Sequence, residues 1–312
     1  MKKAKINEIS TAARKDGIRL FLMTIPFLVL IFIFSYMPLW GWRYSLYYYK
    51  PGLKLSNCEF VGLKWFGLLF SDKYYRRDMI RVLKNTLGMS FLGLGTSWMP
   101  MMFAILLSEV HAPKYKKLVQ TLTTVPHFIS WVLVYAIAYS MFSLGDGLIN
   151  KILIKLGLSE NGIDFLADPN HLWIKMWLWG NWKGLGWGAI TYLAAISGID
   201  QQLYDAAMVD GASRWQRIWH VTIPGLIPTF LVLFIISVGN IISAGMEQYL
   251  VFSNGFTSEH LEVIDLYVYN QGVQGQRYSY TTAIGMMKTV ISIILIMSAN
   301  GVAKLVRGDS VI

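Results

Sequence analysis

The chain has 312 residues, of which 54% are hydrophobic and only 15% are charged, so it is too apolar for an ordinary soluble domain. Its formal net charge of +10 does not indicate nucleic-acid binding, because basic residues also gather in cytoplasmic loops and at lipid headgroups. No repeated aromatic–basic motif is present. The single cysteine, Cys58, excludes an internal disulfide, and the scattered histidines predict no metal site.

Several apolar runs are long enough to cross a bilayer, which takes roughly 20 mostly apolar residues in a helix. Such segments must be helical, because backbone groups in lipid have no water to bond. The predicted spans lie near 18–40, 86–107, 118–142, 172–196, 227–251 and 282–305. The sequence therefore predicts an all-α membrane protein with six transmembrane helices, in which a cytoplasmic basic tail, 1–17, precedes a single transmembrane domain, 18–312.

The fourth predicted span is the least apolar. It carries Lys175, Asn181 and Lys183 together with four glycines. Charged side chains are costly inside a bilayer. We therefore expect this helix to be shielded from lipid by the other spans.

Charge counting alone leaves the orientation open. The basic tail and the loop that carries Lys114, Lys116 and Lys117 both favour the cytoplasm. The loop from 41 to 85 is equally basic, yet the same scheme places it outside. A motif has to decide between the two orientations.

That motif lies between the fourth and fifth spans. Asp205 is followed by Ala206 and Ala207, and Gly211 comes after three further residues. Nine residues later the run ends in Val221-Thr222-Ile223-Pro224. This pattern closely resembles the EAA signature of ABC importer permeases, with Asp205 in place of the usual Glu. The fold implied is that of a type I importer permease.

The resemblance implies a coupling helix in the loop 198–224, which docks in a groove on a cytoplasmic ATPase. Asp205 is then expected to meet a basic group, while Ala206, Ala207, Met208 and Gly211 supply the packed contact. Gly211 admits positive φ, and Pro224 is expected to begin the next span. The alternative is an amphipathic loop helix without a partner. A cytoplasmic loop here places both termini in the cytoplasm.

The resemblance also implies partners. They are a second, non-identical permease subunit, two ATPase subunits and an extracytoplasmic solute-binding lipoprotein, assembled at the bacterial cytoplasmic membrane. The chain lacks the GxxxxGK[ST] nucleotide loop, so we expect the partner ATPase to bind ATP and Mg²⁺. No nucleophile–base arrangement is evident, so no cofactor, catalytic residue or enzymatic activity is expected in this chain.

Polar and small residues on the fourth and fifth spans are candidates for the solute path. At 3.6 residues per turn, two stripes flank the coupling loop. The stripe on the fourth span consists of Gly180, Lys183, Gly184 and Trp187, and the stripe on the fifth consists of Ser237, Asn240, Ala244, Glu247 and Gln248. Trp182 is a further candidate on the fourth span. Two alternatives stay open: a role of the glycines in helix packing alone, and a Lys183–Glu247 pair that only neutralises charge. Lys288 has no partner evident from the sequence.

The predicted solute is a carbohydrate. Tryptophan faces together with amide and carboxylate groups suit sugars, and the segment 180–187 resembles the substrate-contacting stretch of maltose-type permeases. Segments 57–66 and 81–87 resemble permeases for oligosaccharides and polysaccharide fragments. The alternatives are another solute class (amino acids, phosphonates or polyamines) and a membrane sensor or scaffold that recruits an ATPase without transport.

Overall fold

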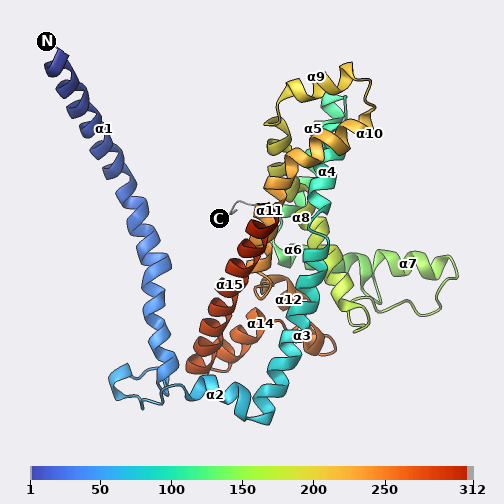
Figure 1. Ribbon diagram of the computed structural model, residues 1–312. Coiled ribbons are helices and arrows are strands. Elements are labelled where there is room, and N and C mark those ends of the chain that lie inside the picture. The colour runs from blue at the N-terminus through green and yellow to red at the C-terminus, as the bar shows by residue number, and fades with distance from the viewer. Residues whose placement is uncertain (1, 308–312) are drawn as a thin grey trace. The chain divides into compact units, whose positions relative to one another are not determined.

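The computed structural model describes the backbone of residues 2–307 and the side chains of residues 16–301, 303 and 304. Over that backbone helices are the only regular secondary structure, with one isolated antiparallel bridge between Tyr47 and Phe60 and no β-strand. The predicted all-α class is confirmed. The chain divides into two compact units, Met1–Leu68 with Gln271–Met286, and Leu69–Asn270 with Met287–Ile312 (Figure 1).

The first unit contains the first apolar span, Asp16–Leu46. Its helical segments are α1 (Lys2–Ile31), η1 (Phe32–Tyr36), η2 (Met37–Leu46), η3 (Leu55–Asn57), most of α2 (Lys64–Ser71) and of η6 (Asn270–Gln274), and the start of α15 (Tyr278–Arg307). The indole of Trp65 donates to the Tyr47 carbonyl at 3.0 Å, and the Tyr49 amide donates to the Ser279 hydroxyl at 3.0 Å. These bonds hold the loop after η2. The basic side chains of residues 2–15 lie outside the described side chains.

The second unit carries the remaining helices. In chain order they are α3 (Lys73–Gly95), α4 (Met99–Ser108), α5 (Pro113–Thr124), η4 (Val125–Phe128), α6 (Trp131–Phe142), α7 (Leu148–Lys155), α8 (Leu172–Ser197), α9 (Gln201–Val209), α10 (Arg214–Arg217), η5 (Ile218–Thr222), α11 (Ile223–Gly239), α12 (Glu247–Phe252), α13 (Ser258–Leu261), α14 (Ile264–Tyr269) and the rest of α15. Figure 1 shows α9, α10 and α5 at one end of this unit, whereas α3 begins at the other.

Helix α8 lies between two hydrophobic cores of the second unit. One core gathers Met176 of α8 with residues of α3, α6, α12 and α14, and the other gathers Ala189 and Tyr192 of α8 with residues of α4, η5 and α11. Neighbours on several sides, including α3, α4, α5 and α11, pack against α8. This agrees with the expectation that the least apolar span needs shielding from lipid.

Four helical segments of the described chain are long and apolar enough to cross a membrane. They are Asp16–Leu46, Lys73–Ser108, Arg214–Gly239 and Tyr278–Gly301. A bent pair, Pro113–Phe128 with Trp131–Phe142, makes a fifth when it is taken as one span. Helix α8 has 26 residues but is not among these apolar segments. The count of six spans therefore stays a prediction.

The third predicted span, 118–142, is not one straight helix. Helices α5 and α6 meet at 105° across a break of a few residues. Pro126 lies in this break, where it has no amide hydrogen to donate. The Ser130 hydroxyl then caps α6 by accepting from the Leu133 amide at 3.4 Å. The apolar composition of this region concealed both the proline break and the new cap.

The fifth predicted span, 227–251, is wrong as a single helix. The helical run begins earlier, at Arg214, and α11 ends at Gly239. Residues 240–246 are not helical, and Gly245 has a φ of +82°. Glycine adopts a positive φ at little cost, and this conformation is incompatible with a helix continuous through residue 245. The short helix α12 then begins at Glu247, so the stripe expected along one continuous helix does not exist.

Close backbone approach at Gly186 yields a test of helix packing. A Cβ atom at Gly186 would overlap the backbone of Thr123 in α5, whereas one at Gly184 would have no neighbour within 4 Å. We expect Gly186→Ala to lower the unfolding free energy by about 1–3 kcal/mol because the two backbones must separate. The matched variant Gly184→Ala should be neutral or slightly stabilising. Thermal unfolding of the purified complex measures both, and equal melting temperatures would contradict this packing.

Candidate functional site

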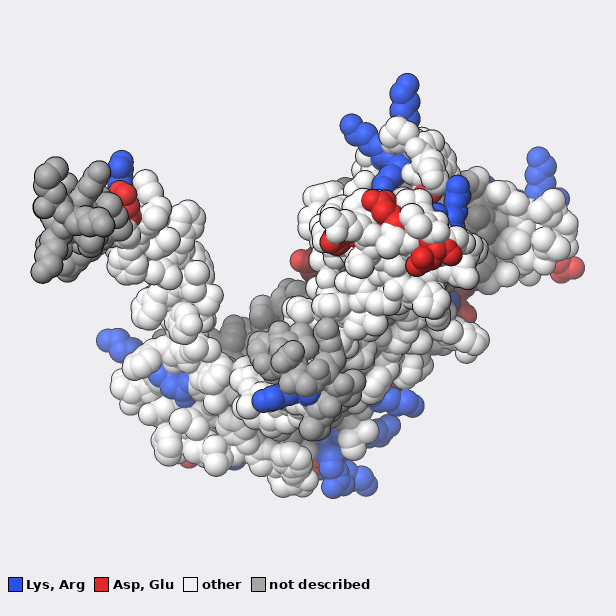
Figure 2. All heavy atoms as spheres, turned by 45° about the horizontal axis from the view of Figure 1, so that its top comes forward, with Lys and Arg blue, Asp and Glu red and all other residues white. Residues whose placement is uncertain are grey.

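Helix α9 carries the acidic–alanine part of the motif on an exposed surface. Asp200 caps the helix by accepting from the Gln202 amide at 2.9 Å. Asp205 is exposed and forms no ion pair with any described side chain. Met208 and Val209 are 49% and 89% exposed. Figure 2 shows acidic and basic side chains together at the end of the unit where α9 and α10 lie. An apolar strip with an unpaired carboxylate suits a protein surface bearing a basic group.

Gly211 ends α9 in a Schellman motif. Its φ is +74°, as the sequence predicted. The Ala212 amide donates to the Ala207 carbonyl at 2.9 Å, and the Gly211 amide donates to the Met208 carbonyl at 3.1 Å. A Cβ at Gly211 would meet nothing within 4 Å, so backbone conformation rather than space requires glycine here. The motif glycine thus sets the direction in which the chain leaves α9.

Side-chain contacts tie α9 to the start of α11. The Tyr204 hydroxyl lies 3.0 Å from the hydroxyl of the buried Thr222. A Cβ at Gly225 would lie 2.7 Å from Ile199, so the chain before α9 approaches α11 closely. Pro224 lies in the first turn of α11, but the helical run continues into it through the π-turn η5. Pro224 therefore does not mark the start of the helix. Direct contacts join α9 and the chain before it to this helical run.

One face of α8 holds Lys183 and Trp187 against the break between α5 and α6. The Lys183 ammonium donates to the His127 carbonyl at 2.6 Å and lies 5.5 Å from the centre of the Trp131 ring. The Trp187 ring stacks on the His127 ring at 4.5 Å. Lys183 forms no ion pair with Glu247 in the described chain, so the suggested neutralising pair is wrong.

Gly184 and Gln248 line a common cavity of about 260 Å³. The Gln248 amide donates to the Met176 carbonyl at 2.7 Å, which fixes α12 against α8. The other polar lining comes from Asn181 and from Thr96 and Ser97 at the break between α3 and α4. Transporter sites are often built at such helix breaks near mid-membrane. Sequence reasoning missed Thr96 and Ser97 because two polar residues within a largely apolar run do not by themselves indicate a helix break.

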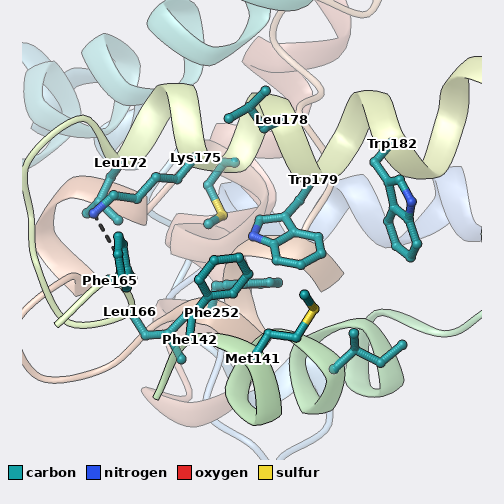
Figure 3. A pocket seen from close by; sticks show the side chains of 12 residues that line it. Met141, Phe142, Phe165, Leu166, Leu172, Lys175, Leu178, Trp179, Trp182 and Phe252 are labelled. Atoms are coloured by element: carbon teal, nitrogen blue, oxygen red, sulfur yellow. Dashed lines mark hydrogen bonds between the residues drawn. The ribbon is translucent and has the colours of Figure 1, made fainter. Parts of the chain in front are cut away.

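Trp182 lies on a different face of α8 from Lys183 and Gly184. With Trp179, Phe142, Phe165 and Phe252 it lines an aromatic cavity of about 520 Å³ (Figure 3). The Trp179 and Trp182 rings meet edge to face at 5.7 Å. Figure 3 shows these rings facing one another between α8 and α6, with Lys175 at one end. The predicted aromatic residues therefore serve two separate surfaces.

The predicted stripe of the fifth span is dispersed. The Ser237 hydroxyl donates to the Leu233 carbonyl of its own helix at 2.8 Å. Asn240 is the C-cap of α11, and Glu247 is the exposed first residue of α12. Neither Ser237 nor Glu247 lines the cavity that Gln248 shares with Gly184. Only Gln248 of this predicted stripe meets the predicted residues of α8.

A double-mutant cycle tests the position of Lys183. Because Lys183 and Glu247 are not paired, the stability effects of Lys183→Met and Glu247→Gln should add within about 0.5 kcal/mol. The matched cycle uses Arg81 and Glu262, which are paired at 2.7 Å, and should show a coupling of roughly 0.5–1 kcal/mol. Thermal unfolding of the four variants in each cycle gives the coupling. A Lys183–Glu247 coupling as large as the Arg81–Glu262 coupling would contradict the structure.

Comparison with known proteins places the chain among membrane transport subunits. The family model for the inner membrane component of binding-protein-dependent transport systems matches residues 101–308. Protein LplB of Bacillus subtilis (strain 168) is 38% identical over 294 residues, which cover 94% of this chain and 91% of that protein. The polygalacturonan/rhamnogalacturonan transport system permease protein YteP of the same strain is 37% identical, covering 91% and 87%.

Solved structures agree with the sequence relatives. A chain of a bacterial ABC transporter involved in the import of the acidic polysaccharide alginate is 32% identical, with a TM-score of 0.81, and the match covers 96% of this chain and 99% of that one. A chain of a bacterial alginate ABC transporter in complex with an alginate pentasaccharide-bound periplasmic protein is 33% identical, with a TM-score of 0.81 and coverage of 95% and 97%. The motif at 205–224, the helical fold and these matches agree: the chain belongs to the family of inner membrane components of binding-protein-dependent transport systems, the permease subunits of ABC importers.

Proposed function

We propose that this chain forms part of the translocation path for a carbohydrate, an oligosaccharide or a fragment of a polysaccharide. As an importer permease, it is a transport subunit and not an enzyme. The proposed assembly adds a second, non-identical permease, two ATPase subunits that bind ATP and Mg²⁺, and a solute-binding lipoprotein outside the membrane. The single observation that carries the ATPase-coupled part of this proposal is the exposed surface of α9, capped by Gly211 and tied to the helical run of η5 and α11.

The carbohydrate assignment draws on the site and on the relatives. A permease named for polygalacturonan and rhamnogalacturonan is 37% identical, and the solved transporters of similar fold import alginate. The cavity shared by Gly184 and Gln248 offers the amide and hydroxyl groups that sugar hydroxyls bond, and the cavity at Trp182 offers aromatic faces. Such cavities, mostly apolar with a few polar groups, are typical of small-molecule sites.

The orientation follows from the proposed partner. If α9 meets a cytoplasmic ATPase, then the end of the second unit that carries α9, α10 and α5 lies in the cytoplasm (Figure 1). Both chain termini are then cytoplasmic, in the cytoplasmic membrane of a bacterium.

The mechanism proposed is alternating access. ATP closes the ATPase dimer, which displaces α9 and, through the Tyr204–Thr222 contact, α11. The path then opens outward to a docked binding protein, and the solute enters between the two permeases. Hydrolysis resets the path toward the cytoplasm. This chain converts the displacement of the ATPase into movement of its own helices.

Uptake by the reconstituted complex tests the proposed function. Proteoliposomes holding both permeases, the ATPase and the binding protein should take up labelled galacturonate oligosaccharides when ATP is supplied on the side of the membrane that carries the ATPase subunits. Uptake of amino acids, phosphonates or polyamines instead would contradict the carbohydrate assignment. ATP turnover without uptake of any of these solutes would indicate a sensor or scaffold.

The cap of α9 yields a prediction about coupling. A β-branched residue at a positive φ is strained by about 1–2 kcal/mol, so Gly211→Val should change the end of α9. We expect this variant to insert and assemble normally but to lose stimulation of ATP hydrolysis by the loaded binding protein. ATPase rates of purified complexes, with and without loaded binding protein, measure this effect.

Gly157 provides a matched control. It has a φ of +70°, ends α7 in the same Schellman pattern, and has no atom within 4 Å of an added Cβ. Gly157→Val therefore carries the same backbone strain away from α9 and should keep the stimulation. Normal stimulation in Gly211→Val, or equal loss in both variants, would contradict a specific coupling role for α9.

A further inference from the structure

Lys288 of α15, a cation within an apolar span, has a partner that the sequence did not reveal. Its ammonium is hydrogen-bonded and ion-paired to the Oδ1 atom of Asp265 in α14. The two side chains are only 21% and 22% exposed, so most of each is buried within the protein. An ionisable residue inside a membrane-spanning helix is a candidate for function, because burial of its charge is unfavourable unless it is paired.

The same carboxylate also holds the break between α11 and α12. The Gly245 amide donates to the Oδ2 atom of Asp265 at 3.1 Å. Gly245 has a φ of +82° and lies two residues before Glu247, the first residue of α12. The oxygens of one carboxylate therefore connect α14, α15 and the break. If Asp265 served only to neutralise Lys288, the hydrogen bond from the Gly245 amide would not be needed.

Close packing on α15 fixes the other side of the break. Gly239, the last residue of α11, lies so near Ile296 of α15 that a Cβ atom would overlap its side chain. The break thus begins at one contact with α15 and ends at a carboxylate paired with α15. Beyond it, Gln248 of α12 donates to the Met176 carbonyl and lines the cavity with Gly184.

We infer that Asp265 is a positioning residue for the solute path, which sets α12 and its Gln248 by accepting the Gly245 amide, while Lys288 orients the Asp265 carboxylate. This inference rests on the proposed transport function. It assigns no contact between Asp265 and solute. Its consequence is that the hydrogen bond to Gly245, rather than the ion pair as such, controls the geometry of the cavity.

Paired substitutions separate the two roles. The Asn/Met variant, Asp265→Asn with Lys288→Met, removes both charges but keeps a side-chain oxygen that accepts a hydrogen bond from the Gly245 amide. The Ala/Met variant, Asp265→Ala with Lys288→Met, also removes both charges and leaves the Gly245 amide without this acceptor. Neither double variant leaves an unpaired charge in the membrane, so a difference between them reports on the Gly245 bond.

Transport by the reconstituted complex gives the first measurement. With labelled galacturonate oligosaccharides as the probe, the Asn/Met variant should keep a KM within about twofold of the wild type. The Ala/Met variant should raise KM at least fivefold. Equal KM values in both variants, whether normal or raised, would overturn the inference, because the effect would then not follow the Gly245 bond.

Hydrogen exchange gives a second measurement that needs no solute. In the whole complex, peptides covering residues 240–252 should exchange faster in the Ala/Met variant and at the wild-type rate in the Asn/Met variant. Unchanged exchange in both variants would overturn the inference. If the Ala/Met variant fails to assemble, Asp265→Ser with Lys288→Met replaces it with the same expected results, because the shorter hydroxyl does not reach the Gly245 amide.

The two proposals fail in different ways. A wild-type complex that imports no galacturonate oligosaccharide contradicts the carbohydrate assignment, while the exchange comparison still tests the Gly245 bond. A wild-type complex that imports the oligosaccharide, together with Ala/Met and Asn/Met variants that do not differ, contradicts only the role of Asp265.

Discussion

The shielding of α8 is the constraint around which the second unit is organised. This helix carries Lys175, Asn181 and Lys183, and it is not among the segments apolar enough to cross a membrane on their composition. Backbone carbonyls accept from Lys183 and Asn181, and Phe165 and Asp168 accept from Lys175. Several neighbouring helices pack against α8, and these polar groups find their partners within the protein.

Breaks in the surrounding helices give α8 its polar surroundings. The break between α3 and α4 supplies Thr96, whose hydroxyl accepts from the Trp177 indole at 2.9 Å. The break between α5 and α6 supplies the carbonyl that binds Lys183, and α12, beyond the break after α11, supplies Gln248. Non-helical backbone is tolerated at membrane depth where protein surrounds it. The Tyr204–Thr222 contact joins α9 to the helical run of η5 and α11, and Asp265 joins the break after α11 to α15. A series of contacts therefore extends from α9 to the break before α12.

Local patterns predicted some features of the molecule well. The left-handed conformation of Gly211 and the limits of α8 followed from residue types and from the apolar run. Gly180 and Gly184 of the predicted stripe were less informative about packing, because it is Gly186, outside that stripe, that approaches the backbone of Thr123 closely. The partners of Lys183 and Lys288 depend on long-range packing: one is a carbonyl 56 positions away, and the other is a carboxylate 23 positions away on another helix. Hydropathy also cannot detect a break flanked on both sides by apolar residues, which is why the sequence predicts 227–251 as one span.

The central claim is that α9 meets a cytoplasmic ATPase. Because Cys58 is the only cysteine, a Cys58→Ser chain carrying Met208→Cys reports on this surface alone. In intact cells, a membrane-impermeant maleimide should not label position 208, whereas inverted vesicles should be labelled once the ATPase has been stripped off and protected when it is bound. Labelling of intact cells, or labelling that does not change with the ATPase, would contradict the account.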